Sequence, residues 1–246
     1  TGKNGQLVIQ RLVPSDNEKE VFCQLVNNYT IDKNVTVVSK SVTLRVEYRP
    51  VITFNTSSPL TVNETQTISG LCNASGNPNP DTPRWREKSA DSILRFDNIS
   101  RTDTGTYTCV ATANSSRYGK LESQKQLDII VQYAPDVSVT VTGPTLQNMT
   151  LTVLCEARGF PAKYTFHSWK QRWGNKVIRS DLQGTPSSNN NTLKLESLSL
   201  QDMGTYICSV DNNIRGIDGN LIQAGDVDIK VTGRPTVLKE EEDHFA

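Results

Sequence analysis

Apolar and polar positions alternate in three short stretches of the chain, and each stretch is followed by a polar break. The stretches share one spacing, which runs Leu7, Ile9, Leu12 and Asp16; Leu94, Phe96, Ile99 and Asp103; and Leu193, Leu195, Leu198 and Asp202. Alternation with a period of two predicts a half-buried β-strand, and the break after it predicts a turn. The pattern therefore predicts the same strand and turn three times.

Three further segments also share an ending. They read "LRVEYRP" (44–50), "IIVQYAP" (129–135) and "IKVTGRP" (229–235). Each alternates as a strand does and closes on a proline, which has no N–H to donate to a continuing ladder. We expect boundaries near these prolines, which give units at 1–49, 50–134 and 135–234 and an acidic tail or stalk at 235–246. Almost no residues separate the units, so we expect them to abut as a semi-rigid rod without a flexible linker.

A longer motif repeats around the cysteines. Cys72 opens "CNASGNP" and Cys155 opens "CEARGFP", so a strand should end in a Gly/Pro turn at both places. Trp85 follows the first copy and Trp169 the second. The copies then close with "DTGTYTC", which reaches Cys109, and "DMGTYIC", which reaches Cys208. This order is an internal repeat.

The order Cys, Trp, Asp-x-Gly-x-Tyr-x-Cys resembles the immunoglobulin superfamily over nearly the whole chain. The resemblance implies an all-β fold of tandem immunoglobulin-like β-sandwiches, one partial and two complete. It also implies residue roles, which are disulfides Cys72–Cys109 and Cys155–Cys208, core tryptophans Trp85 and Trp169, and tyrosine corners at Tyr107 and Tyr206. Free or zinc-bound cysteines are the alternative. Zinc sites place cysteines in close pairs, which this chain lacks.

The fifth cysteine, Cys23, follows the first alternating stretch and Asp16. Cys109 and Cys208 follow the other two stretches in the same way, but with one residue fewer between the aspartate and the cysteine. By the resemblance it is a strand F cysteine whose strand B partner lies upstream of Thr1. Residues 1–49 are then the C-terminal part of a truncated domain, with Cys23 unpaired. Lys19 and Val21 replace the glycine and tyrosine of the motif here. Half a sandwich cannot bury its inner face, so we expect this unit to be the least stable part.

Candidate N-glycosylation sites are more frequent than composition alone predicts. Nine of the twenty asparagines begin Asn-x-Ser/Thr, where about four are expected by chance. They are Asn28, Asn34, Asn55, Asn63, Asn73, Asn98, Asn114, Asn148 and Asn190. Paired cysteines and glycosylation both indicate an extracellular or secretory location. They argue against the alternative of an intracellular muscle-type immunoglobulin array.

Charge and motif content exclude several functions. The 26 basic and 26 acidic residues balance, so nucleic acid and anionic membrane surfaces are not expected partners. No apolar run is long enough to span a bilayer. The histidines, His167 and His244, lack a catalytic or metal motif, and Asp103 and Asp202 belong to turns. The acidic run 240–243 lacks the spacing of a calcium loop. We expect no cofactor, no metal, no small-molecule substrate and no enzyme activity.

The remaining function is binding. The "GNPNP" and "VQYAP" segments resemble those of cell-surface adhesion and recognition receptors such as the nephrin, CD22-like and hemicentin groups. The resemblance implies cell adhesion or recognition through protein contacts, homophilic or heterophilic, at the surface of a single-pass membrane protein. The alternatives are a secreted immune recognition or matrix protein and the ectodomain of a signalling receptor.

The third unit offers the expected binding surface. Stretches 164–181 and 206–231 contain no sequon, whereas Asn148 and Asn190 fall by strand order on the opposite sheet. Arg172 and Trp173 at the C to C′ turn and Arg215 in the F to G loop are candidate partner-binding residues, because aromatic and arginine side chains often anchor interfaces. The alternative is that Trp173 packs inward and Arg215 is merely solvated.

Overall fold

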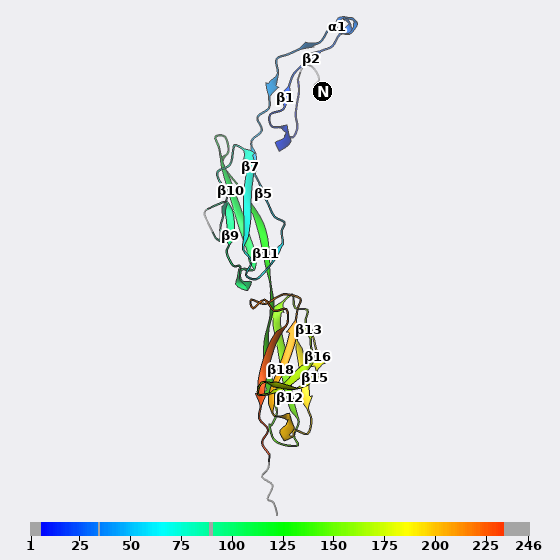
Figure 1. Cartoon of the computed structure of the whole chain (residues 1–246). Helices are drawn as coiled ribbons and strands as arrows, with labels where there is room; N and C mark the ends of the chain where they lie inside the picture. The colour runs from blue at the N-terminus through cyan, green and yellow to red at the C-terminus, as the bar shows by residue number, and fades with distance from the viewer. Residues whose placement is uncertain (1–5, 34, 89–90, 234–246) are drawn as a thin grey trace, which may run out of the picture. The chain divides into compact units, whose positions relative to one another are not determined.

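A computed structural model describes residues 6–33, 35–88 and 91–233 of the chain (Figure 1). Strands dominate these residues, as the all-β prediction requires. The chain divides into two compact units. The first contains the residues up to Leu60 together with 67–97 and 105–129, and the second contains 61–66, 98–104 and the residues from 130 onward.

The elements of the first unit are η1 (Pro14–Asp16), β1 (Glu20–Val21), β2 (Gln24–Leu25), α1 (Asn28–Asp32), β3 (Val37–Val38), β4 (Val42–Thr43), β5 (Tyr48–Phe54), β7 (Ile68–Asn77), β8 (Arg84–Trp85), β9 (Ile93–Phe96), β10 (Gly105–Ser115) and the first part of β11 (Gly119–Thr142). The second unit contains most of β6 (Leu60–Asn63), η2 (Arg101–Asp103), the rest of β11, β12 (Leu151–Phe160), β13 (Thr165–Phe166), β14 (Trp169–Trp173), β15 (Lys176–Leu182), β16 (Thr185–Pro186), β17 (Asn190–Leu195), η3 (Leu200–Asp202), β18 (Gly204–Asp211) and β19 (Gln223–Ile229).

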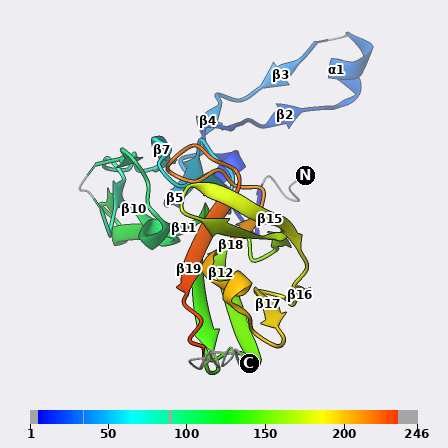
Figure 2. The same cartoon turned by 60° about the horizontal axis from the view of Figure 1, so that its bottom comes forward.

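Residues 6–44 form an extended hairpin. β1 pairs with β4 and β2 with β3, and α1 connects β2 to β3 at the tip (Figure 2). The strand expected at Leu7 and Ile9 is not formed, which corrects the sequence prediction. Both side chains and Leu12 are between 43% and 50% exposed. Among the described residues no second sheet covers this hairpin, so the apolar side chains of the alternating stretch have no core to pack against.

The first complete sandwich lies in the first unit. One sheet has the order β5–β7–β9, and the facing strands have the order β11–β10–β8. Cys72, Trp85, Leu94, Cys109 and Leu127 are at most 1% exposed between them. β7 ends immediately before Pro78, so the predicted Gly/Pro turn after Cys72 is confirmed.

The second sandwich lies in the second unit. β11, β12, β17 and β16 form one layer, and β15, β14, β18 and β19 form the other, with β13 beside the end of β18 (Figures 1 and 2). Its core is one cluster of buried residues, among them Leu151, Cys155, Trp169, Tyr206 and Cys208, each fully buried. β12 ends before Pro161, as the repeat predicts.

Pro50 and Pro135 do not end their strands, which is a second correction. β5 runs through Pro50 and β11 runs through Pro135. The pairing register shifts between Tyr48 and Val51 in β5 and between Tyr133 and Asp136 in β11. Proline suits an extended backbone and lacks only the donor, so the ladder is interrupted while the strand continues. Pro235 and the tail lie outside the described residues, and the unit boundaries remain predictions.

The three predicted turns are confirmed, and they share one geometry. η1, η2 and η3 end at Asp16, Asp103 and Asp202. In each, the aspartate accepts a 2.9 Å hydrogen bond from the backbone N–H three residues earlier. The bond closes the turn on itself and explains why an aspartate follows each alternating stretch.

Candidate protein-binding face

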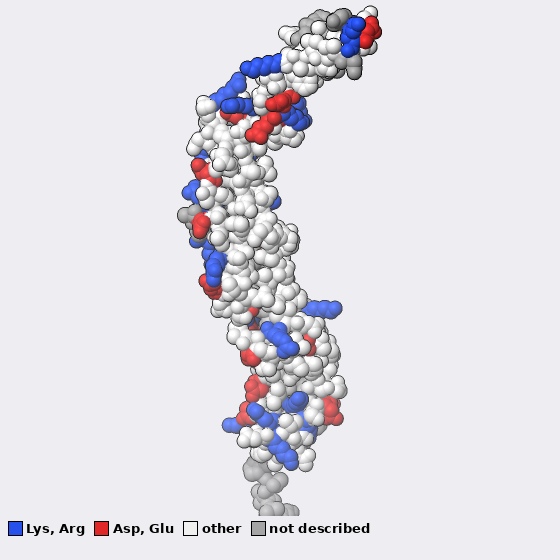
Figure 3. Space-filling view, turned by 45° about the horizontal axis from the view of Figure 1, so that its top comes forward, with Lys and Arg blue, Asp and Glu red and all other residues white. Residues whose placement is uncertain are grey.

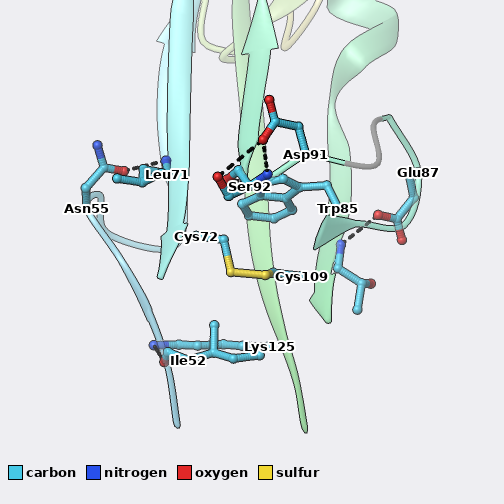
Figure 4. Close-up of a disulfide and its surroundings, with 11 residues drawn as sticks. Ile52, Asn55, Leu71, Cys72, Trp85, Glu87, Asp91, Ser92, Cys109 and Lys125 are labelled. Atoms are coloured by element: carbon cyan, nitrogen blue, oxygen red, sulfur yellow. Dashed lines mark hydrogen bonds between the residues drawn. A yellow bond between two sulfur atoms is a disulfide. The ribbon is translucent and has the colours of Figure 1, made fainter. Parts of the chain in front are cut away.

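A disulfide and a tryptophan brace the first sandwich (Figure 4). Cys72 on β7 is bonded to Cys109 on β10. The Trp85 ring lies beside this bond and stacks on Phe54 with ring centres 5.3 Å apart. The Trp85 Nε1–H donates to the Ser92 carbonyl oxygen at 2.9 Å, so the buried indole has its partner.

The second sandwich repeats this arrangement. Cys155 on β12 is bonded to Cys208 on β18, and Trp169 is fully buried in the same core. The Tyr206 hydroxyl donates to the Asp202 carbonyl oxygen at 3.1 Å, which is the geometry of a tyrosine corner. Burial, and then the nearby Asp202 charge, raise the pKa of Tyr206 to about 12. Tyr107 is 9% exposed and lies edge-on to Phe96.

Asp202 also connects the turn to β15. Its carboxylate accepts from the Ser199 backbone N–H and hydroxyl and from the Arg179 guanidinium, at 2.8–3.0 Å. Burial by itself would raise the pKa of Asp202, but these donors outweigh burial and hold the pKa below its ordinary value. β15 is thereby held against η3.

Buried polar contacts also fix the second half of β14 against the start of β18. The Gln171 side-chain amide, fully buried, donates to the carbonyl oxygens of Gln201 and Met203 at 2.9 Å each. Gly204 has a φ of +129°, and a Cβ there would lie 2.5 Å from the Arg172 carbonyl oxygen. Only glycine fits, because both the backbone conformation and the close approach exclude a side chain.

The outer surface of β14, β15, β18 and β19 presents charged side chains in two rows. We call this surface the β18 face. Pairing across β14, β18 and β19 places Lys170, Ile207 and Asp226 in one row and Arg172, Thr205 and Asp228 in the next. Directly opposite residues share a face, and the alternate positions Trp169, Gln171 and Tyr206 are buried inside. Each row therefore runs from a cation through a neutral residue to an anion.

Two of the four charged side chains of the β18 face form a contact with each other, and two form no ion pair among the described residues. Arg172 and Asp226 form a long contact of 3.8 Å across the sheet. Among the described residues no ion pair involves Lys170 or Asp228. Val177, opposite Arg172 on β15, is 46% exposed and adds an apolar position. The face thus combines exposed charge with a partly apolar centre.

The three predicted partner-binding residues are not brought together. Arg172 lies on the β18 face, and Trp173 is 57% exposed at the end of β14, so it does not pack inward. Arg215 lies beyond the opposite end of β18, because Arg172 pairs with Thr205 near its start. The seven steps of β18 separate the two ends by about 23 Å. Arg215 donates to the Gly219 carbonyl oxygen at 3.0 Å within its own loop.

Sequence reasoning missed the anions of the face. Asp226, Asp228 and also Lys170 belong to no motif that would mark them. The segments "WKQRW" and "GDVDI" do place like charges two residues apart, which puts them on one face of a strand. What the sequence does not contain is the register that sets the cations and anions in common rows.

The F to G loop, 212–222, is ordered by its own polar groups. The Asp218 carboxylate accepts from the Asn220 backbone N–H at 2.9 Å and side-chain amide at 2.8 Å. The backbone N–H of Asn220 is the main cause that lowers the pKa of Asp218. Ile217 at the tip is 78% exposed.

None of the described sequon asparagines belongs to β14, β15, β18 or β19, the strands of the β18 face. Asn28, Asn55, Asn63, Asn73, Asn98, Asn114 and Asn148 are exposed, and Asn190 is half-buried. Asn148 precedes β12, and Asn190 begins β17, in the layer opposite the β18 face. Asn34 lies outside the described residues.

The remaining reactive groups form no second site. Cys23 is free and exposed between β1 and β2, and its backbone N–H donates to the Ser39 hydroxyl at 2.8 Å. The His167 Nε2 lies 2.9 Å from an Asp211 carboxylate oxygen. Residues 6–33, 35–88 and 91–233 contain no metal-binding cluster of three or more ligands. In the same residues no helix has the length and apolar character to cross a bilayer. Figure 3 shows basic and acidic side chains interspersed on the face in view.

The fold and its braced cores define a tandem β-sandwich protein of the immunoglobulin type. The model of the immunoglobulin domain family matches residues 49–113 and 135–212, which is more than half of the chain. The chain therefore belongs to the immunoglobulin domain family.

Curated relatives share this family at modest identity. Protein amalgam of Drosophila melanogaster is 26% identical over 203 residues, which cover 75% of this chain and 58% of that protein. Human myelin-associated glycoprotein is 29% identical over 176 residues, which cover 68% and 26%. Human IgLON family member 5 is 28% identical over 171 residues, which cover 67% and 49%. The chain thus spans less than two thirds of the length of each of these relatives.

Extracellular domains 3–5 of Drosophila OTK match with a TM-score of 0.40 and 22% identity, covering 91% of this chain and 73% of that one.

Proposed function

We propose that the chain is part of an extracellular glycoprotein that mediates cell adhesion or recognition by binding proteins through its tandem immunoglobulin domains. Two disulfides suit an oxidising compartment. The excess of exposed sequons supports glycosylation there. The names of two relatives, myelin-associated glycoprotein and a glycosylphosphatidylinositol anchor protein of mouse, are consistent with a cell-surface glycoprotein.

The β18 face is the proposed contact surface. The observation that carries this proposal is a four-stranded sheet face that combines exposed charges with Ile207 and Val177 and carries none of the nine sequons. Bulky glycans would screen a surface from macromolecules, so a sequon-free sheet face is available for binding. Trp173 at its edge supplies an exposed aromatic side chain of the kind that anchors interfaces.

Binding rather than catalysis is the proposed activity. His167 is the one histidine among the described residues, and its ring contacts Asp211. In the same residues no hydroxyl or thiol hydrogen-bonds to that ring, as a nucleophile paired with a base would. The proposed activity is therefore the binding of protein partners.

The test is adhesion of beads coated with the glycosylated chain to cells and to each other. Val177→Lys should abolish the adhesion that wild type shows, because it adds charge to the β18 face. The matched control is Met149→Lys, at a side chain that is equally exposed at 46% but lies in the connection before β12. The control should adhere like wild type. Adhesion that survives Val177→Lys, or no adhesion by wild type to any cell or bead, would reject the proposal.

A further inference from the structure

We infer that the β18 face binds a second copy of the same chain, with the two-fold axis of the dimer parallel to β18. This inference rests on the proposed function and names the partner of the same surface. It follows from the order of charges across the sheet, which makes the face complementary to itself in one orientation only.

Two rows of side chains cross the β18 face from β14 to β19. In the first, Lys170 on β14 lies opposite Ile207, which lies opposite Asp226 on β19. In the second, Arg172, Thr205 and Asp228 take the same order. The cations thus form one edge of a stripe, the anions form the other, and β18 runs between them.

A two-fold axis along β18 places each row over the same row of the partner in reverse order. Lys170 of one copy then faces Asp226 of the other, and Arg172 faces Asp228. Each pair occurs twice, because a two-fold interface repeats every contact. Ile207 faces its own equivalent at the centre. Face-to-face sheets stay within about 30° of each other, so this correspondence of rows is kept approximately.

The other face-to-face arrangement is excluded by charge. A two-fold axis perpendicular to the strands leaves the order of charges along a row unreversed, so cations lie over cations and anions over anions. An example is an axis along the first row. Lys170 would then face Lys170, and Asp226 would face Asp226. Like charges in contact across an interface cost several kcal/mol, so charge selects the axis parallel to β18.

The dimer should be weak and reversible. Four strands span about 19 Å, so this face alone buries less than a standard protein interface. Arg172 also lies 3.8 Å from Asp226 of its own chain, and this contact competes with its pairing to Asp228 of the partner copy. Many copies on one surface would compensate through multivalency.

The test uses two single charge reversals. Lys170→Glu and Asp226→Lys, each alone, should weaken self-association about tenfold or more, because each variant opposes like charges twice. An equimolar mixture of the two should associate again. In the mixed dimer the introduced glutamate of one variant faces the introduced lysine of the other, and the untouched Asp226 faces the untouched Lys170. Sedimentation velocity on the glycosylated chain measures both effects. A Cys23→Ser background removes disulfide dimers through the exposed thiol.

The matched controls are Lys194→Glu, on β17, and Glu196→Lys, just after it, both exposed near the opposite layer. Neither should change self-association, and their mixture should gain nothing. Wild type that stays monomeric while its beads adhere to cells would overturn the dimer and leave the proposed function standing. Single variants that associate like wild type, or a mixture that is no stronger than its components, would also overturn it. The recovery in the mixture shows in addition that both variants are folded.

Discussion

Asp202 shows how much one turn residue does for the β18 face. It accepts from Ser199 and Arg179, and its carbonyl oxygen holds the Tyr206 hydroxyl. The contacts join η3, β15 and β18, which are three of the elements that carry or border the face. The alternation in the sequence identified Asp202 as a turn residue, and the structure adds Arg179 as its partner.

The charge of Asp202 should make the stability of this sandwich depend on pH. Its pKa is lowered in the folded chain, below the ordinary 3.8. The stabilisation is therefore fully present above the unfolded pKa and is lost as pH falls through the folded pKa. Asp202→Asn should melt at a lower temperature than wild type at about pH 6, and the gap should shrink below about pH 4.

Thermal melts across this pH range provide the measurement. Asp181→Asn is the matched control, because that side chain is exposed on β15 and forms no ion pair among the described residues. Its melting temperature should follow that of wild type at every pH. A gap for Asp202→Asn that stays constant between about pH 6 and about pH 3 would show that its charge does not contribute.

At the scale of the strand, alternating apolar residues correctly predicted a strand and its buried side chains where a second sheet covers them. Leu94 and Leu193 lie in β9 and β17 as expected, at 1% and 4% exposure. Leu7 has the same pattern and lies outside any strand, at 50% exposure. Period-two alternation predicts which side chains of a strand would face the core of a sandwich. Whether they are buried depends on a partner sheet, which the local sequence does not encode.

Strand ends and strand register were the least predictable features. Pro135 interrupts pairing in β11 without ending it, because φ near −65° is compatible with an extended chain. The rows of the β18 face depend on register between β14, β18 and β19, which long-range pairing determines. Arg172 and Trp173 could be identified from residue type. The position of Lys170 and Asp226 in the same row, on either side of Ile207, could not.

The hairpin of residues 6–44 leads to a prediction about its cysteine. Cys23 is exposed and free, and the other four cysteines are paired. Maleimide should therefore label one thiol per chain in the native, unreduced protein, because disulfides do not react. Mass spectrometry counts the labels.

The control for this prediction is Cys23→Ser, which should take up no label. Denaturant should not increase the count of one in wild type. A count of zero in wild type would contradict a free, exposed Cys23, and a count of three or more after denaturation would contradict the pairing of the other four cysteines.

At the scale of the whole molecule, the sequons are unevenly distributed over the strands. The layer opposite the β18 face carries Asn190, and the first sandwich carries several exposed sequons, but β14, β15, β18 and β19 carry none. The proposed adhesion thus has, in the second sandwich, a sheet face whose four strands contain no sequon. The relatives place the chain among proteins that are longer than it, so its partners must be found by experiment.

A glycan on β15 next to Val177, at the border of the β18 face, tests this claim most directly. Ile178→Asn creates the sequon Asn-Arg-Ser on β15, at a side chain that is 46% exposed. Ile178→Gln makes a similar change without a sequon, and Asn190→Gln removes the native sequon on β17. Bead adhesion should be lost for the Ile178→Asn variant once mass spectrometry shows that the introduced asparagine carries its glycan, and should persist for both controls. Adhesion by the glycosylated variant at the wild-type level would contradict the account, because a bulky sugar would then occupy the face without blocking the partner.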